Sequence, residues 1–150
     1  MGFSSDTFGT NTICTRAQII TFMYRLFGNG EVPSQACPFT DVSKDIYYYN
    51  AVNWAYSHHI TTGTTASTFS PDKSCTRAQI VTFLYNYLGK GQTDTSTVFR
   101  DISRSSYYYN AVNWAVAKGV TSGTTSTTFS PDQTCSRAEA VTFLYRAVNS

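Results

Sequence analysis

Three arginines recur in the same local sequence, and their position makes them the strongest candidates for chemistry. Each is the second residue of a Thr/Ser-Arg-Ala-Gln/Glu run, which places them at Arg16, Arg77 and Arg137. The spacing from Thr or Ser to Gln or Glu is that of a capping box and predicts a helix that starts at each arginine. A cation there faces the positive end of the helix dipole, which costs roughly a few tenths of a kcal/mol. Its threefold repetition indicates a specific partner for the guanidinium.

The residue types allow two kinds of partner for these arginines. A guanidinium can form a forked ion pair with a carboxylate of the neighbouring repeat, such as Asp41 or Asp101. Alternatively, a helix N-terminus beside an arginine binds an anionic ligand, a carboxylate above all, because the backbone N–H groups and the guanidinium attract the same charge. The repetition does not separate the two, since a duplicated sequence copies structural and ligand-binding residues alike. Both hypotheses stay open at the level of the residues.

Two aromatic clusters repeat in the same way, as the run Tyr-Tyr-Tyr-Asn-Ala-Val-Asn-Trp-Ala. Helical spacing predicts that Trp54 and Trp114 belong to the core. Three consecutive tyrosines cannot all lie on one face of a helix, so at least one in each run is predicted to be exposed or at an interface. Tyrosine suits a wet surface because it combines an apolar body with a polar tip. An exposed Tyr47 or Tyr107 would offer a surface on which a sugar can stack.

The other reactive side chains do not form a catalytic or metal-binding set. His58 and His59 have no counterpart in the later repeat, and nothing near them in the sequence completes a nucleophile and base. No phosphate-binding loop or serine nucleophile motif occurs. Three cysteines stand directly before the helix starts, where a buried side chain packs on the first turn, and their spacing fits no metal site; we predict thiols at Cys14, Cys75 and Cys135. No catalytic residue, metal or cofactor is predicted.

Composition and charge exclude several classes of partner. The chain has 150 residues, of which 41% are hydrophobic and 13% charged, so it can bury enough apolar surface to fold. Its net charge of +2 argues against a non-specific nucleic-acid partner. No apolar run approaches the roughly 20 residues that span a bilayer, so no membrane partner is predicted. The first five residues do not resemble the start of a signal peptide.

The chain is built from a repeat of about 60 residues. The segments that begin at Phe39 and Phe99 match over their whole length, whereas the N-terminal stretch matches only the second half of the unit. We divide the chain into residues 1–28, the second half of a first repeat, and residues 38–90 and 98–150, two full repeats. Glycine-rich stretches between them are predicted linkers.

Each full repeat is predicted as helix, polar loop, helix. The first helices cover roughly residues 48–57 and 108–118, where Ala and Val form an apolar stripe at helical spacing. His59 and Gly119 are predicted to adopt the left-handed conformation just past these helices. The second helices start at the capping boxes, and glycines end the first two of them. The predicted fold class is all-α, with long loops rich in Thr and Ser that carry the function.

The repeated blocks together resemble the S-layer homology (SLH) domain family. The resemblance lies in Phe-x-Asp-Val/Ile, the tyrosine cluster before Ala-Val, Thr-x-Gly-Thr, Thr-Phe-Ser-Pro-Asp and Cys-Thr/Ser-Arg-Ala, in the order typical of the family. The last block corresponds to the family's Ile-Thr-Arg-Ala-Glu signature, with Cys in place of Ile. Gln18 and Gln79 replace its Glu and keep the capping box, and Tyr47 and Tyr107 stand where Trp is common.

The resemblance implies a non-catalytic module that anchors proteins at the cell surface by binding secondary cell-wall polysaccharide. Such domains form a pseudo-threefold helical spindle, in which the signature arginine of a groove between repeats binds the carboxylate of a pyruvate ketal. The loop glycines would let backbone amides approach the sugar, and Gly2 matches them by position. The candidate glycan-binding residues are Arg16, Arg77, Arg137, Gly63, Gly123, Tyr47, Tyr107, Asp41 and Asp101.

The missing first half-repeat limits the number of grooves that the resemblance implies. One groove is expected around Arg77 with Tyr107 and one around Arg16 with Tyr47, while the groove around Arg137 lacks its partner helix. A second chain could supply that helix, which would make the protein a homo-oligomer. The alternative function is a protein–protein interaction or self-assembly module of a surface protein. A wall hydrolase is disfavoured because no acid/base pair of carboxylates is apparent.

Overall fold

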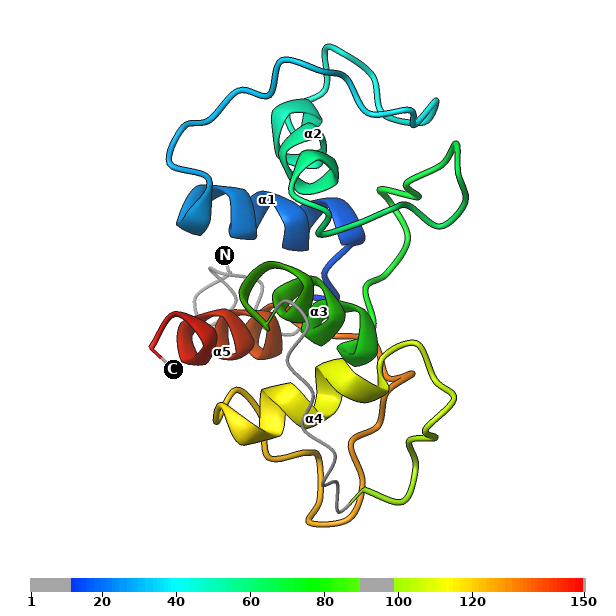
Figure 1. Cartoon of the computed structure of the whole chain (residues 1–150), viewed down its shortest axis with the longest axis vertical. Coiled ribbons are helices and arrows are strands. Elements are labelled where there is room, and N and C mark those ends of the chain that lie inside the picture. Colours follow the sequence, from blue (N-terminus) through cyan, green and yellow to red (C-terminus); the bar gives the residue numbers. More distant parts are fainter. Residues whose placement is uncertain (1–11, 90–98, 150) are drawn as a thin grey trace. The chain divides into compact units, whose positions relative to one another are not determined.

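The computed structural model describes residues 12–89 and 99–149 and places them in two compact units. The N-terminal unit comprises residues 15–74, and the C-terminal unit comprises residues 12–14 together with the described residues from 75 onward. Helices are the regular elements of both units, and within the described ranges β-structure is limited to isolated bridge pairs. The all-α class is therefore confirmed (Figure 1). None of the described helices is long and apolar enough to cross a membrane.

The second helix of each repeat starts where its capping box predicts. α1 (Arg16–Phe27), α3 (Arg77–Leu84) and α5 (Arg137–Val148) each follow a Thr or Ser whose hydroxyl oxygen accepts a hydrogen bond from the backbone N–H three residues on. The Gln or Glu side chain at that position accepts in return from the backbone N–H of the Thr or Ser. This exchange satisfies donors that the helix itself leaves unpaired, which is why the starts are predictable.

The ends of these helices follow the sequence less closely. α1 stops before Gly28, as predicted. The α-helical pattern of α3 stops at Leu84 instead of at the glycine, and Tyr85–Gly89 continue as a π-helical turn, η1. The wider turn places the Gly89 backbone beside Trp114, where a Cβ on residue 89 would lie 3.0 Å from the indole Nε1. Tertiary packing therefore decides how α3 ends.

The first helices of the two full repeats are α2 (Tyr49–Ser57) and α4 (Tyr109–Ala117), each starting one residue later than predicted. His59, with φ of 60°, and Gly119, with φ of 75°, follow their ends. Both residues are therefore left-handed, as the sequence predicted. Histidine reaches this region more readily than most side chains, and glycine reaches it without a steric cost.

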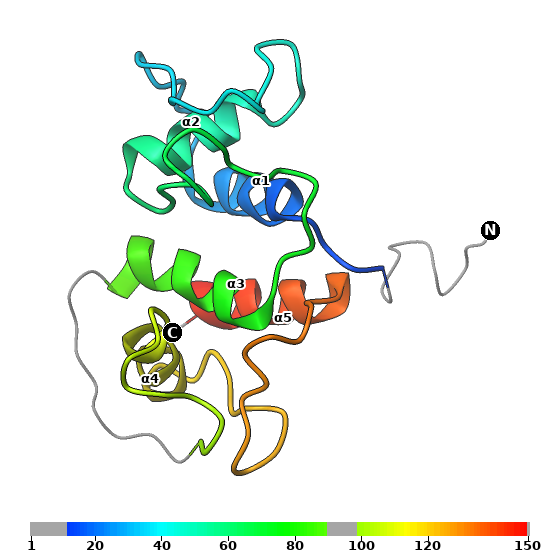
Figure 2. The ribbon, with the colours of Figure 1, turned by 90° about the vertical axis from the view of Figure 1, so that its right-hand side faces the viewer.

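Each first helix packs through its tryptophan on the second helix of the preceding repeat. In the N-terminal unit α2 packs on α1, where the Trp54 ring lies 5.6 Å from that of Tyr24. In the C-terminal unit α4 packs on α3, where the Trp114 ring lies 5.8 Å from that of Tyr85, and α3 also contacts α5 (Figure 2). Trp54 and Trp114 are 0% and 1% exposed, which confirms their place in the core.

Three cysteines join their backbones in a closed ring within the C-terminal unit. The N–H of Cys14 donates to the carbonyl of Cys135 (2.9 Å), Cys135 donates to Cys75 (2.8 Å), and Cys75 donates to Cys14 (2.8 Å). The three side chains are buried, and the chain's four cysteines, all of them described, form no disulfide. The ring gives equivalent residues of the three repeats a local threefold relation. The pseudo-threefold spindle of the whole chain stays a prediction.

The outward face of α5 is exposed, whereas the equivalent faces of α1 and α3 are covered by α2 and α4. Val141, Tyr145 and Val148 of α5 are 53%, 69% and 51% exposed. The residue equivalent to Val141 is Val81 of α3, which is fully buried, and the residue equivalent to Tyr145 is Tyr85 of η1, which contacts Trp114. Among the described residues, no first helix takes that place on α5.

Candidate functional site

The Phe-Ser-Pro-Asp loop of the C-terminal unit is held at its phenylalanine from two sides. The N–H of Phe129 donates to Asp101 Oδ1 (2.9 Å), and the carbonyl of Phe129 accepts from Arg77 Nε (2.8 Å). Asp101 Oδ2 accepts from the N–H of Ser130 (2.7 Å), whose φ of 59° is unusual for a residue with a side chain. The carboxylate therefore stabilises a strained turn with two charge-assisted hydrogen bonds.

The N-terminal unit repeats this arrangement. Asp41 accepts from the N–H groups of Phe69 (2.9 Å) and Ser70 (2.8 Å), and Arg16 Nε donates to the Phe69 carbonyl (2.9 Å). In both units the recurring aspartate and the recurring arginine hold the same loop without pairing with each other. Arg77 therefore forms no ion pair with Asp101, but it does pair with another acid of the neighbouring repeat, Glu139, as the first of the two hypotheses allows.

The guanidinium of Arg77 is buried in an aromatic setting. Its side chain is 5% exposed, and its central carbon lies 4.8 Å from the ring centre of Phe129 and 5.2 Å from that of Phe143. Nη1 donates to Glu139 Oε2 at 3.2 Å. Nη2 is buried and has no hydrogen-bond partner. Because an unsatisfied buried charged donor is costly, this nitrogen marks a place where a ligand acceptor would be stabilising.

The helix N-terminus beside this arginine offers no free backbone donors. In α3 the N–H groups of Arg77 and Ala78 donate to the carbonyls of Gln133 (2.9 Å) and Pro131 (3.0 Å). In α1 the first two N–H groups donate in the same way to carbonyls of the loop that follows Phe69. The hypothesis that the arginine and the backbone amides of its helix together bind an anion is therefore wrong for the amides of α1 and α3. At Arg77 the donor left without an acceptor is Nη2 of the guanidinium.

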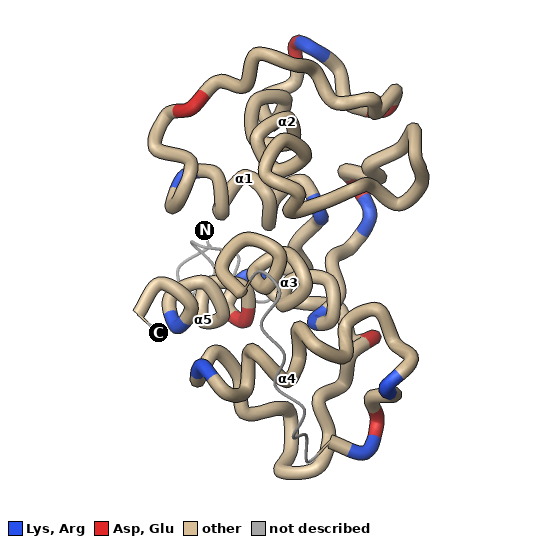
Figure 3. The backbone as a smooth tube through the Cα atoms, in the orientation of Figure 1, with Lys and Arg blue, Asp and Glu red and all other residues tan. Residues whose placement is uncertain are grey.

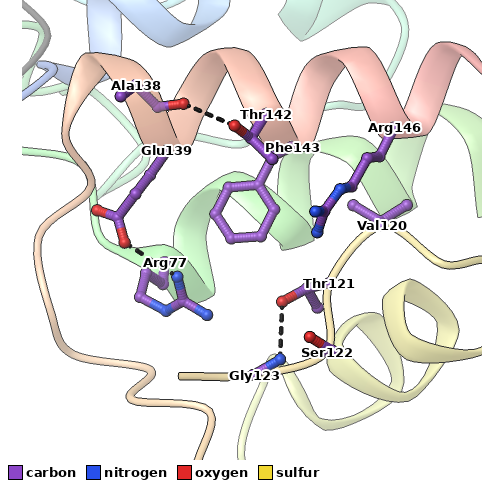
Figure 4. A pocket seen from close by; sticks show the side chains of 10 residues that line it. All are labelled: Arg77, Val120, Thr121, Ser122, Gly123, Ala138, Glu139, Thr142, Phe143 and Arg146. Atoms are coloured by element: carbon purple, nitrogen blue, oxygen red, sulfur yellow. Dashed lines mark hydrogen bonds and ion pairs between the residues drawn. The ribbon is translucent and has the colours of Figure 1, made fainter. Parts of the chain in front are cut away.

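A pocket of about 230 Å³ lies beside Arg77 in the C-terminal unit (Figure 4). One wall is the loop that follows α4, and another is a face of α5. Its lining residues are Arg77, Val120, Thr121, Ser122, Gly123, Ala138, Glu139, Thr142, Phe143 and Arg146. The pocket thus combines two guanidinium groups, one carboxylate, hydroxyls and an aromatic ring, a set suited to a polar ligand with an anionic group and an apolar face.

Gly123 lines this pocket, and Gly63 is its equivalent in the N-terminal unit. Their φ angles are 93° and 90°, and a Cβ on either would lie 2.5 Å from a ring carbon of the buried Phe99 or Phe39. Their N–H groups donate to Thr121 Oγ1 (3.1 Å) and Thr61 Oγ1 (3.0 Å). Packing and backbone conformation therefore require glycine here, and its amide already has an acceptor.

The other predicted site residues differ in how exposed they are. Tyr47 and Tyr107 are each 67% exposed, and Tyr107 does not line the pocket. Arg16 is 4% exposed, like its counterpart Arg77, whereas Arg137 is half-buried. Gly2 lies outside the described residues.

Sequence reasoning missed the contribution of α5 to the pocket. Glu139, Thr142, Phe143 and Arg146 line it from that helix. Their spacing in the sequence could have indicated this, because residues at i, i+3, i+4 and i+7 share one face of a helix. In the sequence Glu139 belongs to a capping box and Phe143 to an apolar helix face, and the contact of Glu139 with an arginine 62 positions away could not be predicted.

Charged residues of both signs are interspersed along each unit (Figure 3). No basic stripe of the kind that binds nucleic acid runs along any described helix. The pocket is therefore a local concentration of positive charge on a nearly neutral chain.

Comparison with known proteins decides the family. The sequence profile of the S-layer homology domain matches residues 38–81 and 98–141, which is more than half of the chain. The chain belongs to the S-layer homology domain family. This confirms the resemblance seen in the repeated blocks and locates the chain at the cell surface, as an anchoring module.

Relatives of this SLH chain are considerably longer proteins. An endoglucanase of Bacillus sp. (strain KSM-635) is 32% identical over 86% of the chain, and a cellulosome-anchoring protein of Acetivibrio thermocellus is 28% identical over 98%. A surface-layer 125 kDa protein of Lysinibacillus sphaericus is 28% identical over 67%. The chain spans 14%, 34% and 8% of these relatives, respectively.

Proposed function

We propose that the Arg77 pocket binds an anionic substituent of secondary cell-wall polysaccharide, such as the carboxylate of a pyruvate ketal, and thereby attaches the chain to the wall. The observation that carries this proposal is the buried Nη2 of Arg77, which has no partner and lies beside an open pocket. A carboxylate oxygen would supply the acceptor that this nitrogen lacks. A charge-assisted hydrogen bond in a low-dielectric site is stronger than one in water.

The rest of the pocket suits a sugar. The exposed Ser122 can hydrogen-bond a sugar hydroxyl, while the buried Phe143 ring forms an apolar part of the pocket wall beneath Arg77. Tyr107 is 67% exposed, and we propose that it contacts a further sugar of the polymer. We extend the proposal to Arg16, with Tyr47 and Gly63 of the same unit and with Asp41 holding the Phe69 loop, and to Arg137.

The proposed activity is binding without turnover. Glycoside hydrolysis requires two carboxylic residues on opposite sides of the scissile bond. Glu139 is the single carboxylate among the lining residues of the pocket, and it is engaged by Arg77. Asp101 uses both carboxylate oxygens on the loop backbone.

Substituting Arg77 tests the proposal. We expect Arg77→Gln to lower the affinity for purified cell walls about 10- to 100-fold, because a hydrogen bond to a charged group contributes about 1.5–3 kcal/mol. Arg104→Gln is the matched control, since Arg104 is an exposed arginine of the same unit outside the pocket. Binding is measured by co-sedimentation with walls before and after mild acid removal of ketals.

The result that contradicts the proposal is equal binding to untreated and ketal-free walls by the unsubstituted chain. That measurement needs no variant, so it holds even if Arg77→Gln loosens the loop at Phe129. Circular dichroism and the thermal midpoint establish whether that variant is folded. A folded Arg77→Gln protein that binds walls as tightly as the Arg104→Gln protein also excludes the pocket.

A second candidate function, self-assembly, is favoured by the exposed face of α5. Val141, Tyr145 and Val148 occupy positions that α2 and α4 cover on the other second helices. A second copy of the chain carries the same exposed α5 face, and two such faces can cover each other. The proposed assembly is a homodimer in which this face is covered.

Replacing Tyr145 by lysine tests this assembly. We expect the unsubstituted chain to show concentration-dependent dimers in sedimentation velocity, and Tyr145→Lys to weaken them at least tenfold, because a charge would enter an apolar interface. Tyr107→Lys is the control, since Tyr107 has nearly the same exposure away from α5. A chain that is monomeric at every concentration rules out self-assembly.

A further inference from the structure

We infer that Glu139 is a specificity-determining residue that weakens the affinity of the Arg77 pocket for anions. The inference rests on the proposed function, because it concerns how strongly the same pocket binds an anionic sugar. Glu139 lines the pocket, and its side chain is 33% exposed, so it would face a bound ligand. Figure 4 shows its carboxylate directed at Arg77 from α5.

The three guanidinium nitrogens of Arg77 differ in their hydrogen-bond partners. Nε is used by the Phe129 carbonyl, and Nη1 by Glu139 Oε2. Nη2 is the guanidinium nitrogen without an acceptor. Nη1 carries a second N–H besides the one that Glu139 accepts, so a ligand carboxylate competes with Glu139 for the terminal edge of the guanidinium, whereas an arginine free of Glu139 would offer both terminal nitrogens without this competition.

Contacts other than the one with Glu139 also hold the Arg77 side chain in its orientation. The Phe129 carbonyl fixes Nε at 2.8 Å, and the guanidinium lies over the rings of Phe129 and Phe143. These contacts remain when the carboxylate is neutralised. The effect of Glu139 on an anion is therefore mainly electrostatic, and it acts against binding.

The chain itself shows which substitution removes the charge and keeps the fold. Glu139 Oε1 accepts from the Ser136 N–H at 3.0 Å, as the capping box requires. Gln18 and Gln79 make the same contact with Oε1, at 2.9 and 3.0 Å, in the capping boxes of α1 and α3. A glutamine at 139 would keep this hydrogen bond and replace Oε2 with an NH₂ group, which cannot accept from Arg77 Nη1 and so leaves that nitrogen to the ligand.

The formal charge of the pocket changes accordingly. The two arginines and one glutamate that line it give a net charge of +1, and Glu139→Gln raises this to +2. Arg146 is exposed at the pocket, so its charge is screened by solvent, whereas that of Arg77 is buried. The carboxylate beside Arg77 is therefore the charge whose removal an anionic ligand would experience most.

The test is calorimetric titration of the full chain with a pyruvylated amino sugar and with its ketal-free counterpart. We expect Glu139→Gln to bind the pyruvylated sugar about tenfold more tightly, as removing a like charge near a partly exposed site predicts. Its affinity for the ketal-free sugar should stay unchanged. Asp132→Asn, which removes an exposed acid of the same unit outside the pocket, should change neither affinity.

The other outcomes separate this inference from the proposed function. If the unsubstituted chain binds the pyruvylated sugar and Glu139→Gln binds it equally or more weakly, Glu139 assists the ligand and the inference is overturned while the function stands. If neither protein binds the pyruvylated sugar, both the inference and the proposed function are wrong. Glu139→Ala, which also loses the capping contact, should show the tighter binding together with a lower thermal midpoint, which separates the charge effect from helix stability.

Discussion

Replacing Gly123 by alanine will lower the free energy of unfolding by about 3 kcal/mol. Two costs add up, because a left-handed alanine is about 1–2 kcal/mol less stable than glycine and an overpacked core costs about 1–3 kcal/mol. The new Cβ would lie 2.5 Å from a ring carbon of Phe99 and 2.7 Å from the Thr128 carbonyl oxygen, so the ring or the loop must move. Chemical denaturation measures the loss.

Gly119→Ala is the matched control for this prediction. Gly119 has φ of 75°, but a Cβ there would have no neighbour within 4 Å. It should therefore show the conformational cost alone, about 1–2 kcal/mol. Equal losses in the two variants would mean that Phe99 does not require a glycine. A large difference would identify Gly123 as a packing residue that shapes the pocket wall.

The thiol of Cys135 will react about 1,000-fold more slowly than an exposed cysteine in the folded protein below pH 9. Burial raises the pKa of this thiol from 9.0 to about 12, and the nearby Glu139 adds to the effect. A shift of this size reduces the thiolate fraction about 1,000-fold. Burial also raises the pKa of Cys14. With a thiol reagent at mildly alkaline pH, the partly exposed Cys37 should be labelled first.

The same pKa makes stability depend on alkaline pH. Between about pH 9 and 12 the unfolded chain releases the Cys135 proton, while the folded chain keeps it. The folded state then binds more protons, so the free energy of unfolding falls as pH rises, by up to about 1.4 kcal/mol per pH unit. Cys135→Ala should remove this component of the slope. Rapid labelling of all four cysteines in the folded chain would contradict the buried ring.

Local chemistry explains what could be read from the sequence of this SLH chain. The helix starts were predictable because a capping box involves residues only three positions apart. Trp54 and Trp114 were predictable as core from helical spacing. The left-handed His59 and Gly119 were predictable from the few residue types that tolerate this conformation.

The site followed the sequence only in part. Arg77 was a candidate on account of its position, and the structure places it at a pocket. The hypothesis that the backbone amides of its helix would bind the ligand was wrong, since Pro131 and Gln133 supply their acceptors. Asp101 was predicted either to contact the ligand or to pair with the arginine. In the structure its carboxylate accepts hydrogen bonds from the backbone of the Phe129 loop.

The sequence by itself determined the repeat, the helices, the family and the arginines that recur. Only the tertiary structure decided which nitrogen of Arg77 is left without an acceptor. Its partners, the Phe129 carbonyl and the Glu139 carboxylate, are 52 and 62 positions away along the chain. Capping and periodicity act over a few residues, whereas the unmet hydrogen-bonding capacity of a buried group depends on every segment that folds around it.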